Sequence, residues 1–362
     1  MKILAAAQHP GGINAIIPPL EILIQNDADV LMLTHDRVPK LDKNTLIPYS
    51  STNGRLNSEL NLENIDLIMV GPSIVDGTEP SIDKKVVRMA MEQGIPSLMV
   101  LDNWNNLDQK MDYANGAFGI MPTQVAVMDE HHQNALIDMD FPAEHITVTG
   151  GTQFDKLPDV LSAFTPEDYA RIRDEIGIQQ GALTFFYAGN AFQRNKDSHG
   201  YWDLDNIEIL GDAVAKNPIL EVITKLHPRM TPGSVKEITD YMADHGRGRM
   251  HFVTTGKPTD FVLSSDLTIT PGSTIGLEAA YMNAPVISIQ PDLKGEDELA
   301  RLTQTKLIPY AFSTGEAKQL IGRVVDAEFR NGMRKKLTTF TTDGKATERV
   351  VELAYKTANV KI

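Results

Sequence analysis

Short apolar runs alternate along the chain with longer segments whose apolar residues recur every three or four positions. The short runs, such as residues 3–7 and 183–188, predict buried strands. The longer segments, such as residues 83–93 and 345–357, predict amphipathic helices. Strands that alternate with helices are typical of a parallel sheet covered by helices on both faces. The pattern therefore predicts an α/β protein.

This alternation occurs twice, and a chain of 362 residues is long enough for two domains with sizeable cores. Thr165 and Pro166 mark a helix start between the two series, since Thr is a good N-cap and Pro suits the first helical position. We therefore expect a first domain over residues 1–160, a second over 161–342 and a C-terminal helix within 343–362. In the first domain, Pro18 and Pro19 are expected to kink or delay a helix over residues 13–25.

Residues 268–290 read as a strand, a Pro-Gly-Ser-Thr turn, a helix and a second buried strand. Ser273 or Thr274 is expected to cap the helix, and Glu278 lies about one turn further on. A helix start after a Gly turn offers N–H groups to a phosphate or diphosphate. A carboxylate one turn deeper can accept hydrogen bonds from a ribose diol. The same pattern also fits a capped helix in an ordinary α/β unit.

The segment PGSTIGLEAAYMNAPVI resembles the nucleotide-binding segment of GT-B glycosyltransferases and their relatives. These relatives include the non-hydrolysing UDP-N-acetylglucosamine 2-epimerases and the CDP-glycerol glycerophosphotransferases. The resemblance implies that Gly272, Ser273 and Thr274 contact phosphate and that Glu278 holds the ribose. It also implies a GT-B fold, with two Rossmann-like doubly wound domains that face each other across a cleft and a C-terminal helix that crosses back to the first domain.

Two further segments of the second domain follow strand ends, where ligands gather in an open α/β sheet. Gly189 and Asn190 follow the strand at 183–188, although a plain strand-to-helix turn fits them equally. His227 and Arg229 lie in KLHPR, where Pro228 favours an extended His227. KLHP resembles the KxHP segment of CDP-glycerol-type transferases and of CMP-sugar-dependent capsule transferases, which implies that His227 contacts the nucleotide phosphate. The alternative is a surface loop histidine.

The first domain offers two candidates for a catalytic base. His9 lies in the turn QHPGG, where Gly11 and Gly12 permit close approach of the backbone to a donor. Asp102 follows a strand in LDNWNN, which resembles the DxW loop of surface-polysaccharide transferases. An inverting transferase needs a base to take the proton of the acceptor hydroxyl. The alternatives are a turn histidine bonded to backbone and a cap for the next helix.

No metal or cofactor is expected. The sequence DEHH at residues 129–132 does not place two histidines on one helical face, so we interpret it as a solvated helix start. The resemblance to GT-B enzymes implies catalysis without a bound metal. There is no cysteine, which excludes disulfides and thiolate metal sites.

The net charge of −14 argues against binding to duplex nucleic acid or to anionic membranes by bulk electrostatics. No apolar run approaches the ~20 residues that span a bilayer, and the N-terminal apolar run is too short for a signal peptide. We expect a cytoplasmic protein and leave peripheral membrane contact and oligomeric state open.

The expected function is transfer of a glycosyl or glycerophosphate-type group from a nucleotide-activated donor to a sugar or lipid-linked acceptor, in surface or capsular polysaccharide biosynthesis. A UDP-N-acetylglucosamine 2-epimerase-like activity or a nucleotide-sugar hydrolase would use the same nucleotide site and need no acceptor. A non-catalytic protein that binds nucleotide-sugars is the third alternative.

Overall fold

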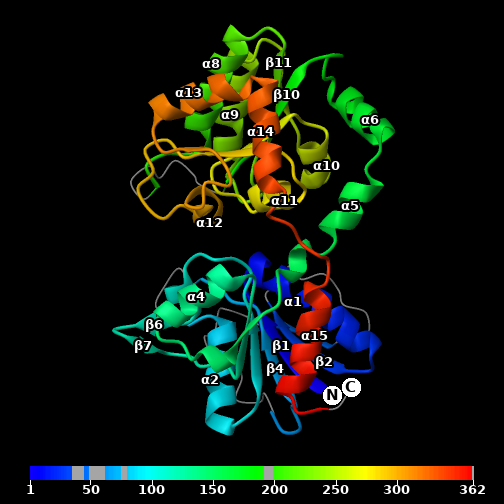
Figure 1. The fold of residues 1–362 in the computed structure, drawn as a ribbon, viewed down its shortest axis with the longest axis vertical. Helices are drawn as coiled ribbons and strands as arrows, with labels where there is room; N and C mark the ends of the chain where they lie inside the picture. The colour runs from blue at the N-terminus through cyan, green and yellow to red at the C-terminus, as the bar shows by residue number, and fades with distance from the viewer. Residues whose placement is uncertain (35–44, 49–61, 75–79, 191–198, 361–362) are drawn as a thin grey trace. The chain divides into compact units, whose positions relative to one another are not determined.

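The computed structural model describes residues 1–34, 45–48, 62–74, 80–190 and 199–360 (Figure 1). The chain forms two compact units. Unit 1 combines Met1–Lys156 with Thr342–Ile362, and unit 2 is Leu157–Thr341. The first segment of unit 1 runs to Lys156, and the helix that follows is grouped with unit 2.

Unit 1 is built on a seven-stranded sheet with the order β3-β2-β1-β4-β5-β8-β9. Each neighbouring pair of its strands is parallel. The strands are β1 (Lys2–Ala7), β2 (Asp29–Thr34), β3 (Thr45–Pro48), β4 (Leu67–Val70), β5 (Ser97–Val100), β8 (Gln124–Val127) and β9 (Ile146–Val148). Its helices are α1 (Pro10–Gln25), α2 (Ile82–Gln93), α3 (Leu107–Lys110), α4 (Glu130–Asp138) and α15 (Ala346–Thr357). A small antiparallel pair, β6 (Tyr113–Ala114) and β7 (Ala117–Phe118), lies outside the sheet.

Helices cover both faces of this sheet because successive side chains of a strand point to opposite sides. In β1, Ile3 and Ala5 pack in one apolar cluster with residues of α1 and α15. Leu4 and Ala6 pack in a second cluster with residues of α2 and α4. α1 and α15 lie side by side although they come from opposite ends of the chain (Figure 1).

The return of α15 to unit 1 is fixed by polar contacts. The Asp155 carboxylate accepts hydrogen bonds from the backbone N–H groups of Ala346 at 3.1 Å and Thr347 at 2.6 Å. These N–H groups have no partner within the helix, so a carboxylate at this place satisfies them. Arg349 adds a bond from its Nε to the carbonyl of Thr149 at 2.6 Å. The C-terminal helix is therefore an integral part of unit 1.

The start of α1 corrects one prediction. The helix begins at Pro10, earlier than expected, and it runs through Pro18 and Pro19 to Gln25. Pro19 has no N–H to donate to the carbonyl of Ala15, and the hydroxyl of Thr152 donates to that carbonyl instead, at 2.6 Å. A hydrogen bond from a distant residue thus replaces the one that the proline removes.

Unit 2 is built on a six-stranded parallel sheet with the order β12-β11-β10-β13-β14-β15. The strands are β10 (Leu183–Ala188), β11 (Leu220–Lys225), β12 (Met250–Phe252), β13 (Leu267–Thr270), β14 (Val286–Ile289) and β15 (Tyr310–Ala311). The helices are α5 (Leu157–Ala163), α6 (Pro166–Ile176), α8 (Asp203–Lys216), α9 (Pro232–His245), α10 (Pro258–Leu263), α11 (Ile275–Tyr281), α12 (Ala300–Thr303), α13 (Thr314–Val324) and α14 (Ala327–Leu337).

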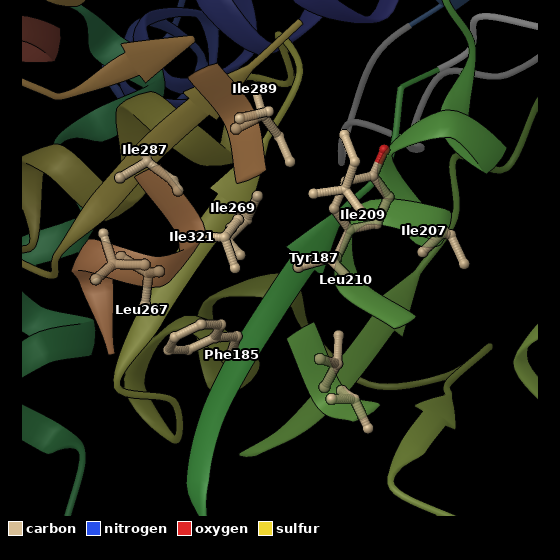
Figure 2. Close-up of a cluster of buried hydrophobic side chains, with 14 of the residues drawn as sticks. Phe185, Tyr187, Ile207, Ile209, Leu210, Leu267, Ile269, Ile287, Ile289 and Ile321 are labelled. Atoms are coloured by element: carbon tan, nitrogen blue, oxygen red, sulfur yellow. The ribbon is translucent and has the colours of Figure 1, made fainter. Parts of the chain in front are cut away.

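One face of this sheet carries a large apolar cluster, part of which is drawn in Figure 2. Phe185 and Tyr187 of β10 pack there with residues of α8, α9, α13 and α14. Phe186 points to the other face, where its ring lies 5.5 Å from that of Phe261 in α10. Thr165 caps α6 as expected, by accepting a hydrogen bond from the N–H of Asp168 at 3.1 Å.

The sequence patterns did not predict α14 or β15. α14 is dominated by charged residues, and its large apolar residues, Phe329, Met333 and Leu337, give only a narrow stripe. β15 is a two-residue strand, too short for a periodic signal. Within the described ranges, every helix is too short or too polar to cross a lipid bilayer.

Candidate functional site

Each sheet has a point at which its strand order reverses. In unit 2 the chain moves from β10 to β11 on one side and from β13 to β14 on the other. In unit 1 the same reversal falls between β1 and β4. In open α/β sheets, ligands bind outside the carboxyl ends of the strands at this reversal. Gly189 and Asn190 follow β10, and Gly272 follows β13, so the fold places these predicted site residues at the reversal of unit 2.

The turn before α11 is held by a residue that sequence reasoning missed. The hydroxyl oxygen of Thr270 accepts hydrogen bonds from the N–H groups of Gly272 at 3.3 Å and Ser273 at 3.0 Å. Thr274 occupies the N-cap position, but its side chain makes no capping bond and is exposed. The hydroxyl of Ser273 accepts a long bond from the N–H of Ile275 at 3.4 Å. Capping by Thr274 is therefore wrong, and Thr270 organises the turn.

Glu278 lies on the first turn of α11 and is mostly buried. Burial raises the pKa of its carboxyl to about 7. No other influence on that pKa stands out, and no side chain of the described residues makes an ion pair with this carboxylate. Glu278 is therefore a desolvated carboxyl that the described protein leaves uncompensated.

Glu298 completes this part of the site and was not predicted. The side-chain amide of Asn190 donates to its carboxylate at 3.4 Å. A Cβ atom at Gly272 would lie 3.1 Å from Cβ of Glu298, so the glycine lets Glu298 pack closely against the turn. Loss of water around the carboxyl raises the pKa of Glu298, although part of the residue is exposed, and Asn190 and Arg229 oppose the shift. Glu298 lies 20 positions after Glu278, outside any recognised motif. The sequence around it therefore does not indicate a site residue.

His227 follows β11 and is partly buried. Its Nδ1 accepts a hydrogen bond from the backbone N–H of Arg229 at 3.1 Å, so the neutral ring carries its proton on Nε2 and is a donor there. Burial, and then the charge of Arg229, lower the pKa of His227. Lys225, the last residue of β11, donates to the carbonyls of Thr254 at 3.2 Å and Thr255 at 3.4 Å.

In unit 1, Asp102 follows β5 and is held from several sides. Its Oδ1 lies 2.8 Å from Nζ of Lys110, a residue only 1% exposed. Its backbone carbonyl accepts from the side-chain amide of Gln153 at 2.6 Å. A Cβ atom at Gly11 would clash with its Oδ2, so the start of α1 packs directly on this carboxylate. Asp102 therefore does not cap the next helix, whose N-cap is Asn106.

Gly11 and Gly12, at the start of α1, allow close packing within unit 1. A Cβ atom at Gly12 would lie 2.5 Å from the carbonyl oxygen of Pro72 and 2.7 Å from the carbonyl carbon of Gly71. The start of α1 thus touches the chain after β4 backbone to backbone. His9 is the N-cap residue of α1 and is partly exposed.

The DEHH segment is not a wholly solvated helix start. Asp129 caps α4 by accepting from the N–H of His132, and it also accepts from the indole N–H of Trp104, both at 2.8 Å. His132 is fully buried, and burial lowers its pKa to about 3. The described residues contain no cluster of three or more histidine, aspartate or glutamate side chains arranged to hold a metal ion.

No protein-family model and no curated protein sequence matches the chain. Several solved structures are similar to it over nearly the whole chain. The S. aureus MnaA structure with UDP superposes with a TM-score of 0.73 at 14% identity, over 99% of this chain and 97% of that one. A putative UDP-N-acetylglucosamine 2-epimerase from Listeria monocytogenes gives 0.67 at 17% identity, over 97% and 94%. A glycosyltransferase from Rickettsia africae gives 0.68 at 11% identity, over 98% of each chain.

The chain has the GT-B fold, with two Rossmann-like units. The predicted α/β fold class with two Rossmann-like units is thereby confirmed. The match extends over nearly the whole chain, so both units share in it. At these sequence identities the structural match establishes the fold alone. The activity has to be inferred from the residues of the site.

Proposed function

We propose that this protein is an enzyme that binds a nucleotide-activated donor in unit 2 and transfers its glycosyl or glycerophosphate-type group to an acceptor hydroxyl. The observation that carries the proposal is the uncompensated carboxyl of Glu278 at the reversal of the sheet. Burying such a group costs free energy unless something hydrogen-bonds to it. A ribose diol, with two hydroxyl donors, is a ligand that suits it.

The neighbouring residues suit the rest of a nucleotide. Ser273 and Thr274 present hydroxyl groups beside Gly272, and His227 with its Nε2 proton and Arg229 provide donors and positive charge for a diphosphate. Two of the similar structures hold such ligands, since S. aureus MnaA was solved with UDP and Anabaena HepE with UDP-glucose. We infer a pyrimidine nucleotide as the donor class.

For the base of unit 1, we infer His9. Asp102 is engaged by Lys110 and packed against Gly11, which suits a residue that holds the loop in place. His9 lies at the carboxyl end of β1, beside the reversal of the sheet, and an imidazole is a common general base near neutral pH. The proton of the acceptor hydroxyl would pass to its ring as the donor's activated atom is attacked.

Epimerisation of a UDP-sugar is the second candidate, because several of the similar structures are UDP-N-acetylglucosamine 2-epimerases. An epimerase needs acidic groups around the sugar. In the described part of unit 1, Asp102 is paired with Lys110, and Asp129 accepts from the N–H groups of His132 and Trp104. Asp83 accepts from the N–H of Ser73 at 3.2 Å, and its other oxygen has no hydrogen-bond partner among the described residues. The commitment of Asp102 and Asp129 favours transfer.

Nucleotide binding is tested by calorimetric titration with UDP, CDP, CMP, GDP and dTDP. Glu278→Ala should weaken binding of the preferred nucleotide by about 1–3 kcal/mol, the range for a lost hydrogen bond to a charged group. The matched control is Glu208→Ala, an exposed glutamate on α8, which should bind as the wild type does. Unchanged affinity in Glu278→Ala would contradict the ribose assignment.

The reaction is tested by mixing the preferred nucleotide-sugar with and without acceptor sugars. His9→Ala should lower turnover by at least ~100-fold with nucleotide affinity kept, the low end for general-base catalysis. Inversion at C2 of the sugar without acceptor would favour the epimerase. Binding with no turnover of any donor would instead indicate a nucleotide-sugar-binding protein.

A further inference from the structure

Unit 2 contains a second buried carboxylate for which nucleotide binding provides no direct role. Asp203 is the first residue of α8 and is 1% exposed. Its Oδ1 accepts hydrogen bonds from the hydroxyl of Tyr187 at 2.7 Å and from the backbone N–H of Asn190 at 3.0 Å. The Tyr187 oxygen in turn accepts from the side-chain amide of Asn206 at 3.1 Å. Asp203 thus ties the end of β10 to the start of α8.

The residues next to Asp203 are shaped around it. A Cβ atom at Gly189 would lie 2.7 Å from its Oδ1, so a side chain there would push the carboxylate away from Asn190. The side chain of Asn190 continues the contacts by donating to Glu298, which packs against Gly272 at the turn before α11. A continuous series of contacts therefore joins Asp203 to both strand ends at the reversal of the sheet.

The burial of Asp203 also lowers the stability of the fold. Its Oδ2 is buried and has no hydrogen-bond partner among the described residues. Burial raises its pKa to about 7, against the hydrogen bonds from Tyr187 and Asn190, which favour the carboxylate. A polar group that is buried and only partly satisfied destabilises a fold, and such groups gather where function requires them.

We propose that Asp203 is a positioning residue for nucleotide binding: by accepting from the N–H of Asn190 it fixes the Gly189–Asn190 turn, and through Asn190 it holds Glu298 beside Gly272. This inference rests on the proposed function, since it assigns the turn a role in that site. It adds a residue which lies behind the site and which the ligand does not touch.

The test compares Asp203→Ala with Asp203→Asn in the full chain, by titration with UDP at a temperature where each variant is folded. Asp203→Ala removes the acceptor for Asn190 and should raise the Kd for UDP by about tenfold or more, the equivalent of one hydrogen bond. Asn keeps an oxygen acceptor of the same shape, so Asp203→Asn should stay within about threefold of the wild type. Unchanged affinity in folded Asp203→Ala, or equal losses in both variants, would overturn the proposal.

Glu221 provides a matched control. It is also a 1% exposed carboxylate of unit 2, and it accepts from the N–H of Gln179 at 3.1 Å and contacts His251 at 2.7 Å. It lies near the amino end of β11, away from the strand ends that carry the site. Glu221→Ala should lower the stability of unit 2 but leave the Kd for UDP unchanged. An equal loss of affinity in Glu221→Ala would show that any destabilisation of unit 2 has this effect.

Hydrogen exchange separates this proposal from the proposed function, because it needs no nucleotide. The Asn190 amide is bonded to Asp203, so its exchange should be accelerated in Asp203→Ala and not in Glu221→Ala. If the wild type binds none of the five nucleotides, the proposed function fails. If Asn190 exchanges equally in the wild type and Asp203→Ala, the positioning role fails whatever binds.

Discussion

The two units carry carboxylates at corresponding sheet edges but treat them differently. Asp102 in unit 1 lies 2.8 Å from the ammonium of buried Lys110, which also donates to Oδ1 of Asn103 at 2.7 Å. Glu278 in unit 2 is largely buried, and burial alone dominates its raised pKa of about 7. The protein compensates one charge internally and leaves the other to be compensated from outside.

This difference is the reason for assigning a structural role to Asp102 and for proposing a ligand-binding role for Glu278. A buried charge that has its own counter-ion stabilises the arrangement around it and has little left to offer a ligand. A buried carboxyl without one lowers the stability of the free protein and regains free energy when a donor arrives. Asp102 is therefore part of the scaffold of unit 1, whereas Glu278 is the basis of the ligand site that we propose for unit 2.

The largest expected effect comes from breaking the compensated pair. Lys110→Met should destabilise unit 1 by about 3–5 kcal/mol, because it leaves Asp102 buried without its counter-ion. Urea denaturation, with hydrogen exchange to locate the loss in unit 1, measures this. The control is Lys318→Met, which breaks the exposed pair with Asp212 at 2.8 Å and should cost less than about 1 kcal/mol. Equal losses would show that burial of the pair is irrelevant.

Removing the uncompensated charge of Glu278 should raise the free energy of unfolding, whereas breaking the Asp102–Lys110 pair lowers it. The pKa of Glu278 is raised in the folded state from 4.5 to about 7, so the folded protein binds a proton more tightly and stability falls as pH rises through that range. Glu278→Gln cannot ionise and should be more stable than the wild type at pH 8, by up to about 3 kcal/mol. Below about pH 4.5 the difference should vanish.

Urea denaturation of both proteins in pH steps measures this difference. A wild type that is the more stable at pH 8, or a difference that does not change with pH, would contradict the assignment of Glu278 as uncompensated. Saturation with the preferred nucleotide should reduce the advantage of Glu278→Gln, since the ligand then satisfies the carboxylate.

A smaller loss of stability is expected when the hydrogen bond to an uncharged group of unit 1, the backbone carbonyl of Ala15, is removed. Thr152→Val removes the donor to the Ala15 carbonyl and should cost about 1–3 kcal/mol, because Pro19 cannot replace that bond. Thr305→Val is the control, since its hydroxyl bonds to the Arg301 carbonyl at 2.6 Å on an exposed surface. Thermal denaturation of the two variants should separate them, and equal shifts in Tm would count against the compensating role of Thr152.

Much of the fold could be predicted from periodicity because strands and helices are local patterns. The strands β10, β13 and β14 and the helix α6 occur where the apolar runs and the Thr-Pro start indicate. The order of those elements also indicated two α/β units and which loops follow strand ends. α14 was missed because the tertiary structure buries a stripe too narrow to stand out in the sequence.

The elements, their alternation and the residue types at the strand ends follow from the amino-acid sequence alone. The partners of the polar groups depend on the fold. They are Lys110 for Asp102, Thr270 for the amides of Gly272 and Ser273, and Asp155 for the start of α15, 191 positions away. Secondary structure depends on neighbours in the chain, whereas a charge or an N–H group is satisfied by whatever the fold brings within about 3 Å. That is why candidate residues could be read from the chain, and why their division into scaffold and ligand site could not.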